Sequence, residues 1–157
     1  MATPAEDPKD ATERTRMLNR AALASLPFDD TRDFEDARRG FLGSLSEVEI
    51  KNDQGRVVWS LRDYAFLADE HAPPTVNPSL WRQARLNMQH GLFEVTQGVY
   101  QVRGFDLSNI TFIEGERGYV VIDPLISAEP AAAGIGGHLF AQSHRPLWRR
   151  ARRRRRA

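Results

Sequence analysis

The 157-residue sequence contains no cysteine, which excludes disulfide bonds and zinc sites built on thiolates. It also lacks any apolar run near the roughly 20 residues that a membrane-spanning helix needs. Residues 1–30 carry acidic side chains throughout and have no continuous apolar stretch, so they do not resemble a secretory signal. These absences together predict a cytoplasmic location.

Clustered metal ligands are scarce as well. The sequence has four histidines, and no acidic residue follows Glu129. A zinc site without cysteine needs imidazoles and carboxylates close together. His71 lies in a proline-rich loop and His90 at the end of an expected helix, so we interpret both as exposed or locally hydrogen-bonded. His138 and His144 have no third ligand nearby in the sequence. We therefore predict that this chain binds no zinc.

The charges are distributed unevenly. Residues 145–157 hold eight arginines and no acid, whereas the 144 residues before them carry 14 basic and 21 acidic side chains. The formal net charge of +1 thus combines an acidic body with a basic end. Such a change of character predicts a boundary between two kinds of segment.

Length and composition predict one folded domain. A hydrophobic content of 41% and a charged content of 27% are typical of a globular chain. We expect a disordered leader over residues 1–10, a folded part over 11–132 and a basic, disordered tail over 133–157. The expected fold class is α+β, with helices and a β-hairpin first and further strands after them.

Two helices are expected near the start. The first covers residues 11–26 and ends at Pro27, because a proline cannot continue a helix. The second begins at Asp30 or Thr31 and continues past residue 40. Its apolar residues keep helical spacing: Phe34, Ala37, Phe41, Leu42 and Leu45.

A third helix is expected to begin at Asn77 and Pro78, a favoured cap followed by a favoured first residue. Four apolar residues then share one face of that helix: Leu80, Trp81, Ala84 and Met88.

Short apolar segments separated by turn residues predict the strands. Segments 48–50 and 57–61 flank a polar turn and predict a hairpin. Segments 92–95 and 99–102 follow, and segment 109–113 places Ile110 and Phe112 on one face.

The last expected strand covers residues 119–122 and contains four consecutive apolar residues. A continuous apolar run predicts a strand that is covered on both faces. If its neighbours are missing, its unpaired edge favours self-association of the chain.

Several segments together resemble the N-terminal region of the alkyl sulfatases, a family of the metallo-β-lactamase superfamily. The similarity extends over about residues 20–132. It rests on DFEDARRGF (33–41), GRVVW (55–59), NPSLWRQ (77–83), GLFEV (91–95), YQVRGFDLSN (100–109) and VIDPLISAE (121–129).

This resemblance implies a zinc-dependent hydrolase that cleaves linear alkyl sulfate esters and forms homodimers. It implies that the strands begin an αββα sandwich, which is incomplete in this chain. In the superfamily, the first zinc ligands lie in a His-x-His-x-Asp-His loop downstream of the strand that ends at Asp123. That motif does not occur in this sequence. We therefore expect the chain alone to be inactive.

The resemblance also implies roles for individual residues. The counterpart of Asp123 orients the ligand loop without binding zinc; the alternative is a carboxylate that caps the turn after its strand. Phe105, Asp106 and Asn109 lie in a loop that borders the substrate entrance in a complete relative, or they form an ordinary turn. Arg103 attracts a sulfate group or is a solvated strand residue.

Two origins remain open for residues 133–157. The loss of acids and the arginine run resemble a GC-rich gene translated in a shifted frame. Alternatively, the tail is genuine, and the chain is a small interaction protein that binds nucleic acid or an anionic membrane. The binding residues would then be Arg149, Arg150, Arg152, Arg153, Arg154, Arg155 and Arg156.

Overall fold

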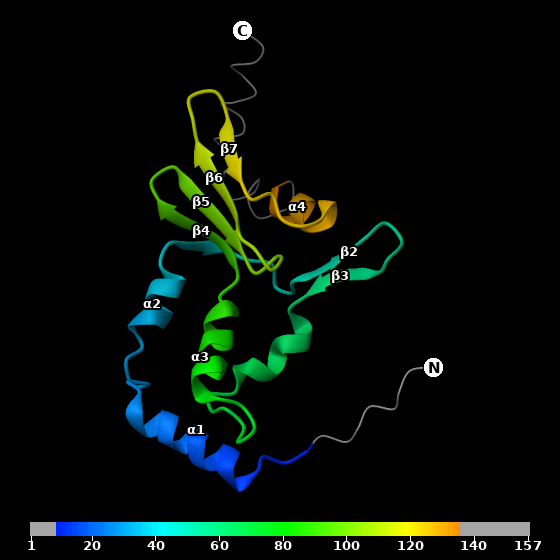
Figure 1. Ribbon diagram of the computed structural model, residues 1–157. Helices are drawn as coiled ribbons and strands as arrows, with labels where there is room; N and C mark the ends of the chain where they lie inside the picture. Colours follow the sequence, from blue (N-terminus) through cyan, green and yellow to red (C-terminus); the bar gives the residue numbers. More distant parts are fainter. Residues whose placement is uncertain (1–8, 136–157) are drawn as a thin grey trace.

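The computed structural model describes residues 9–135, which form a mixed α and β fold as expected (Figure 1). No helix within these residues is long and apolar enough to cross a bilayer. The element order is α1 (Glu13–Ser25), α2 (Arg32–Arg38), β1 (Phe41–Gly43), β2 (Glu49–Lys51), β3 (Val57–Ser60), the 3₁₀ helix η1 (Arg62–Ala68), α3 (Pro78–Asn87), β4 (Gly91–Thr96), β5 (Val99–Arg103), β6 (Ile110–Glu114), β7 (Tyr119–Ile122) and α4 (Ala128–Ile135).

Two antiparallel sheets hold the strands together. The larger sheet has the order β1-β4-β5-β6-β7, and β2 and β3 form a separate hairpin. From β4 to β7 each strand pairs with the next one along the chain, which is a meander. The strands and hairpins expected from the turn residues are therefore confirmed.

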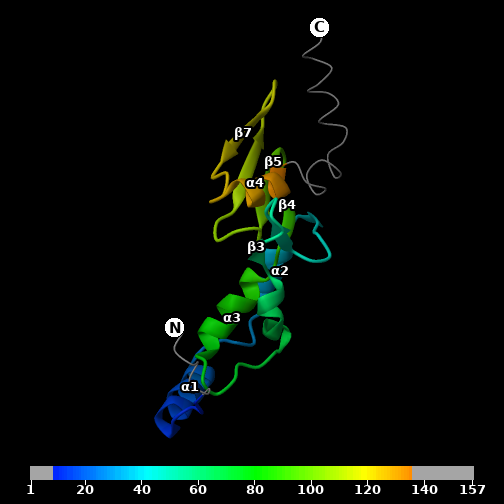
Figure 2. The same ribbon diagram turned by 90° about the vertical axis from the view of Figure 1, so that its right-hand side faces the viewer.

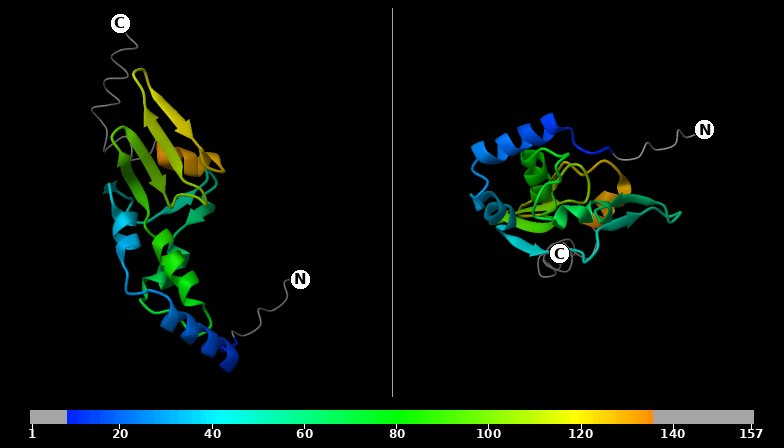
Figure 3. Two further views of the ribbon diagram at one scale, coloured as in Figure 1. Left: turned by 60° about the vertical axis from the view of Figure 1, so that its left-hand side comes forward. Right: turned by 90° about the horizontal axis from the view of Figure 1, so that it is seen from below.

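The molecule is elongated. The five-stranded sheet lies at one end and α1 at the other, with α3 between them (Figures 1 and 2). The β2–β3 hairpin and α4 lie beside the sheet, on the same side (Figure 3). This arrangement separates the helical arm, formed by α1 and α2, from the strand-rich part of the fold.

The main core lies on one face of the larger sheet, where β5 and β6 alternate buried and more exposed positions. Four of the largest fully buried side chains belong to this core: Phe105, Leu92, Ile110 and Val102. Phe93 is also fully buried, but on the opposite face of the sheet, where it packs against Phe41 and Arg103. Each such side chain contributes roughly 1.5–3 kcal/mol through its removal from water. The hairpin extends this cluster with Val48, Ile50 and Leu61.

Helix α4 packs onto the same core and continues past residue 132, where the folded part was expected to end. Gly134 is buried there, although glycine is a poor helix former. A Cβ at this position would lie 3.4 Å from Ile110 Cγ2. That distance is an ordinary van der Waals contact, so this part of α4 packs against β6.

Helix α2 is shorter than the apolar spacing predicted, and the expectation that it includes Phe41 and Leu42 is wrong. Gly40 ends the helical region with a φ of +73°. Its carbonyl accepts a hydrogen bond from Glu94 N at 2.8 Å. Phe41 then joins β1, where its ring packs edge-on against Phe93 at a centroid distance of 5.4 Å. Pairing with β4 overrides the local helical pattern.

Helix α3 begins where expected, because the Asn77 side chain accepts a hydrogen bond from Ser79 N. Trp81 on the expected apolar face is buried and donates from Nε1 to Asp69 O at 3.1 Å. Leu80 is 63% exposed, so its assignment to that face is wrong. The helix buries a narrower stripe than the sequence pattern predicted.

Strand β7 has the unpaired edge that was expected if its neighbours are missing, because it pairs with β6 and forms the edge of the sheet. The expected cover on both of its faces is not found within residues 9–135. Val120, Val121 and Ile122 are 60%, 43% and 51% exposed. Within residues 9–135, no strand pairs with its other edge. The apolar run of β7, which predicts a buried strand, therefore lies at the surface.

Candidate functional site

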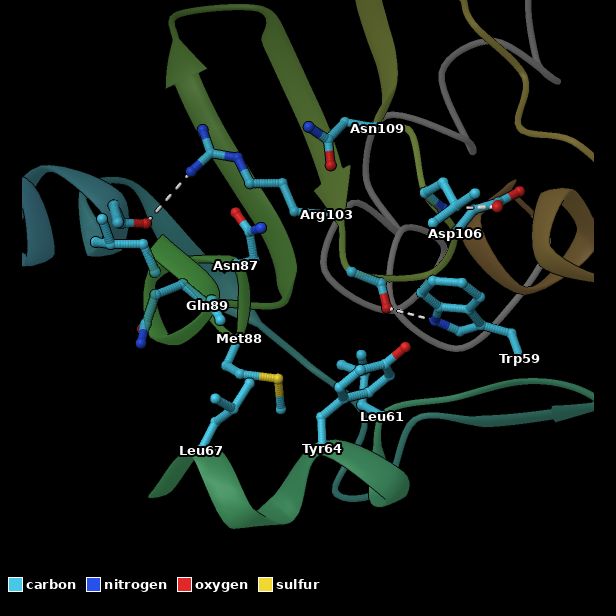
Figure 4. Close-up of a pocket in the computed structure, with 15 residues that line it drawn as sticks. Trp59, Leu61, Tyr64, Leu67, Asn87, Met88, Gln89, Arg103, Asp106 and Asn109 are labelled. Atoms are coloured by element: carbon cyan, nitrogen blue, oxygen red, sulfur yellow. Dashed lines mark hydrogen bonds between the residues drawn. The ribbon is translucent and has the colours of Figure 1, made fainter. Parts of the chain in front are cut away.

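A pocket of about 370 Å³ lies where the larger sheet, η1 and the C-terminal end of α3 meet (Figure 4). That volume falls within the roughly 300–1,000 Å³ typical of small-molecule sites. Its lining comes from four separate segments of the chain, and its walls differ in chemistry.

Arg103, the last residue of β5, provides the charge on one wall. Its Nε donates to Gln101 Oε1 at 2.6 Å, and Nη1 donates to Ala37 O at 3.3 Å. The guanidinium carbon lies 4.2 Å from the Phe93 ring centroid, a cation–π contact that offsets part of the cost of desolvation. Burial lowers the pKa of Arg103 from its ordinary value, yet arginine remains charged in proteins. Within residues 9–135, no carboxylate forms an ion pair with it.

Three amide side chains also line the pocket: Asn87, Gln89 and Asn109. Asn87 Oδ1 accepts from Gln83 Nε2 at 3.3 Å, and Gln89 Oε1 accepts from Arg38 Nε at 3.3 Å. Both contacts use the carbonyl side of the amide, which leaves the NH₂ groups as donors. This wall therefore combines a cation with neutral hydrogen-bond donors.

The opposite part of the pocket is apolar. Leu61 and Leu67 are buried, and Tyr64 and Met88 lie beside them (Figure 4). The indole of Trp59 is held in place because its Nε1 donates to Gly104 O at 2.9 Å. A ligand here would meet hydrocarbon at one end and charge at the other.

Two features oppose an anion in this pocket. The C-terminal end of α3 carries a partial negative charge that disfavours anions by about 0.3–1 kcal/mol. Asp106 also lines the pocket, but it lies on the far side from the Arg103 guanidinium (Figure 4). A hydrogen bond to a charged group contributes about 1.5–3 kcal/mol, so contact with Arg103 outweighs the helix end.

The structure places the three expected entrance residues in different environments. Phe105 is fully buried in the core. Asp106 is 9% exposed, and its two carboxylate oxygens accept from Leu107 N at 2.6 Å and Ile126 N at 2.7 Å. Asn109 is exposed and lines the pocket. Of these three residues, only Asn109 has an exposed side chain that lines the pocket. The entrance role itself stays a prediction.

Asp123 lies just after β7 with a φ of +52° and accepts from Ser108 Oγ at 3.2 Å. Together with the Asp106–Ile126 contact, this bond ties the loop after β5 to the segment before α4. The contact fits a carboxylate that holds a turn. The role in orienting a ligand loop stays a prediction.

The described residues offer poor zinc ligands. Within residues 9–135 there is no group of three histidine or acidic residues that could hold a metal ion. His90 has Nδ1 hydrogen-bonded to Ser44 Oγ at 2.6 Å, and it has no two further histidine or acidic side chains beside it within the described residues. The carboxylate oxygens of Asp106 are both occupied by backbone N–H groups. These residues do not fit the zinc that the resemblance implies.

His138, His144 and the arginines of the tail lie outside the described residues, so the polyanion-binding alternative stays a prediction. The sequence pattern singled out Arg103, Asp106 and Asn109, which line the pocket, but did not bring them together with its apolar wall. Trp59 and Tyr64 are about 25 residues or more from Met88 and about 40 residues or more from Arg103, and nothing in their local patterns indicates that they share a site.

Comparisons with known proteins point to one family. The chain is 50% identical over 139 residues to an alkyl/aryl-sulfatase of Saccharomyces cerevisiae and 47% identical over 143 residues to a linear primary-alkylsulfatase of Pseudomonas sp.. It is 48% identical over 146 residues to an (R)-specific secondary-alkylsulfatase of Pseudomonas sp.. These matches cover 88%, 90% and 93% of this chain. The similarity thus extends beyond residues 20–132.

The comparison with solved structures points to the same family as the sequence comparison. The solved structure of a stereoselective inverting sec-alkylsulfatase from Pseudomonas sp. matches with a TM-score of 0.81 at 49% identity, covering 90% of this chain and 22% of that one. No family model matches the chain. The chain spans about a fifth of the length of the curated relatives, 21–22% in each. It is therefore a homologue of the alkylsulfatases and corresponds to their N-terminal portion.

Proposed function

We propose that this chain supplies the N-terminal part of a zinc-dependent enzyme that hydrolyses alkyl sulfate esters, and that it is inactive alone. The identity of about 50% over nearly the whole chain to three alkylsulfatases carries this proposal. Because the chain spans only about a fifth of those proteins, their activity, substrates and dimeric assembly are part of the proposal.

The poor fit to zinc supports the inactivity of the chain alone. Metal-assisted hydrolysis needs ligands that hold the ion with an open position for water. Residues 9–135 do not bring three such side chains together. In this proposal, the described residues thus act as a scaffold for the part of the enzyme that holds the metal and hydrolyses the ester.

The exposed edge of the sheet supports the scaffold role. Val120 and Ile122 on β7 and Ile126 after it are 60%, 51% and 70% exposed. Apolar strand edges of this kind pair with further structure or recruit another chain. In this proposal, the remainder of an alkylsulfatase covers this surface.

A complementation assay tests the proposal. The first arm incubates the chain with zinc and dodecyl sulfate, and we expect no release of sulfate. The second arm adds the secondary-alkylsulfatase truncated to remove its N-terminal portion that matches this chain, and we expect hydrolysis to appear. Turnover by the chain alone that scales with its concentration would contradict the inactivity.

A matched variant makes the second arm specific. The double substitution Val120→Lys and Ile122→Lys places charge on the β7 edge without touching the main core. It should abolish complementation, whereas Leu18→Lys on the exposed face of α1 should not. If the native chain fails to complement while both proteins remain folded, the scaffold role is wrong.

A further inference from the structure

Two loops that meet beside the β7 edge present the most exposed large apolar side chains of residues 9–135. Leu107, between β5 and β6, is 83% exposed, and Ile126, between β7 and α4, is 70% exposed. We infer that these two side chains form one anchor that docks onto the part of an alkylsulfatase that follows its N-terminal portion. This inference rests on the function proposed above, and it adds the anchor and the carboxylate of Asp106 that positions it.

A single carboxylate holds the two loops together. Asp106 is 9% exposed and follows the fully buried Phe105. Its two oxygens accept hydrogen bonds from Leu107 N at 2.6 Å and from Ile126 N at 2.7 Å, so both backbones lie against one side chain. A buried carboxylate is unfavourable unless such donors satisfy it. Separating the loops would remove one of these two donors, so the carboxylate keeps the two apolar residues adjacent.

The loop that carries Ile126 has an uncommon backbone conformation. Asp123 and Leu125 have φ of +52° and +72°, values that residues other than glycine rarely adopt. Such conformations persist only where the surrounding structure enforces them. Ser108 Oγ donates to Asp123 Oδ1 at 3.2 Å, and Leu125 packs against the core. Ile126 is therefore held in solvent by fixed neighbours, and a partner that covers it needs to order little of the loop.

The place of the anchor in the fold favours the rest of an alkylsulfatase as its partner. The chain corresponds to the N-terminal portion of its relatives and spans 21–22% of their length, so most of each relative follows this portion. Helix α4 begins at Ala128, so in a relative the polypeptide that follows starts within one short helix of the anchor. Ile126 also continues the exposed apolar edge formed by Val120 and Ile122. Continuous apolar patches mark contacts with other parts of an assembly.

Thiol labelling tests the docking in a full-length protein. A chimera carries residues 1–135 of this chain in place of the corresponding N-terminal portion of the (R)-specific secondary-alkylsulfatase. Because the chain has no cysteine, Leu107→Cys and Ile126→Cys each add one thiol, whose reaction with a maleimide is followed by mass spectrometry of its peptide. Both thiols should react at least about tenfold more slowly in the chimera than in the chain alone, since reaction requires access. Asp53→Cys in the exposed β2–β3 turn is the control and should react alike in both.

The outcomes separate the anchor from the proposed function. An active chimera in which both thiols react as fast as in the chain alone would overturn the anchor and leave the proposed function intact. A folded chimera without activity whose thiols are protected would support the anchor and contradict the proposed function. Failure of the chimera to fold would contradict both. Protection that appears in the chain alone as its concentration rises would assign the surface to a second copy and would overturn the inference.

Hydrogen exchange measured by NMR on the full chain tests the positioning role of Asp106. Asp106→Asn keeps the size of the side chain but replaces one acceptor oxygen with an NH₂ group, which cannot accept a hydrogen bond. The amide of Leu107 or Ile126 should then exchange at least about tenfold faster, while the amide of Val102 in the core should not change. Asp123→Asn is the control, because its remaining oxygen still accepts from the Ser108 hydroxyl.

Two further measurements complete this test. In the chimera with Leu107→Cys, adding Asp106→Asn should raise the reactivity of the thiol toward that in the chain alone, which a general loss of stability without local loosening would not do. Equal acceleration of exchange at Val102, or none at Leu107 and Ile126, would overturn the positioning role. If Asp106→Asn does not fold, scalar coupling across the hydrogen bond between Ile126 N and the Asp106 carboxylate carbon decides in the native chain, and its absence would overturn the role.

Discussion

Arg82 on α3 and Asp33 on α2 form a two-point ion pair that joins the helical arm to the rest of the fold. Nε lies 3.0 Å from Asp33 Oδ2, and Nη2 lies 2.6 Å from Asp33 Oδ1. The same guanidinium donates to the carbonyls of Phe28 and Asp30 and lies over the Phe34 ring. One side chain thus holds both the helix and the loop that precedes it.

Replacing Arg82 with glutamine should lower the free energy of unfolding by about 2–3 kcal/mol. The substitution removes several hydrogen bonds to a charged group and leaves two partly buried carbonyls without their donor. Urea unfolding followed by circular dichroism measures the change. Arg39→Gln is the control, because the Arg39–Asp36 pair is largely exposed and contributes about 1 kcal/mol or less. Equal effects would contradict a special role for the Arg82–Asp33 ion pair.

Alanine substitutions at Gly40 and Gly55 form a matched pair that tests the close approach of β4 to Gly40. Both have left-handed backbones, with φ of +73° and +77°, so alanine costs roughly 1–2 kcal/mol at each. A Cβ at Gly40 would lie 2.0 Å from Glu94 O, whereas a Cβ at Gly55 meets nothing within 4 Å. Gly40→Ala should therefore destabilise the fold by at least about 2 kcal/mol more than Gly55→Ala. Thermal unfolding of both variants tests this difference.

The partly buried side chain of His90 should make the stability of the chain depend on pH. Burial lowers the pKa of His90 below its ordinary value of 6.5, so the unfolded chain binds this proton more readily than the folded one. Its contribution to stability is present above pH 6.5 and is lost as the pH falls through the lowered pKa. Urea midpoints measured between pH 7.5 and pH 5 should fall more for the native chain than for His90→Gln. A parallel fall in both would assign the dependence to other groups.

Zinc should neither copurify stoichiometrically nor stabilise the chain. A metal that binds the folded state raises the apparent stability by mass action. Because residues 9–135 bring no three histidine or acidic ligands together, the melting temperature should stay the same with and without excess zinc. Elemental analysis gives the independent measurement. One or two tightly held zinc ions per chain would contradict this prediction.

The β7 edge should drive self-association when the chain is alone. Val120→Lys introduces charge at an exposed apolar edge position, a change that blocks strand pairing. Light scattering should show larger species for the native chain than for this variant. Leu18→Lys on α1 is the control for a general gain in solubility, since Leu18 is also exposed. If Leu18→Lys reduces association as much, the helical arm is responsible.

The sequence by itself determined the features whose signals are local. Asn77 and Pro78 mark the start of α3 because a cap needs only its own turn. Turn residues and alternating apolar positions placed the hairpins and put Ile110 and Phe112 on one buried face. The resemblance to alkylsulfatases was likewise present in the order of residues, and the comparisons confirmed it.

Contacts between distant segments decided the rest. Gly40 is a local signal for the end of α2, but the pairing of β1 with β4 that follows it is not visible in the local sequence. The apolar run of β7 is exposed because exposure depends on what lies beside a strand and not on its own residues. The pocket at Arg103 is built from segments separated by up to about 70 residues in the chain. Helical and strand periodicity act over a few residues, so only the tertiary structure brings such side chains together.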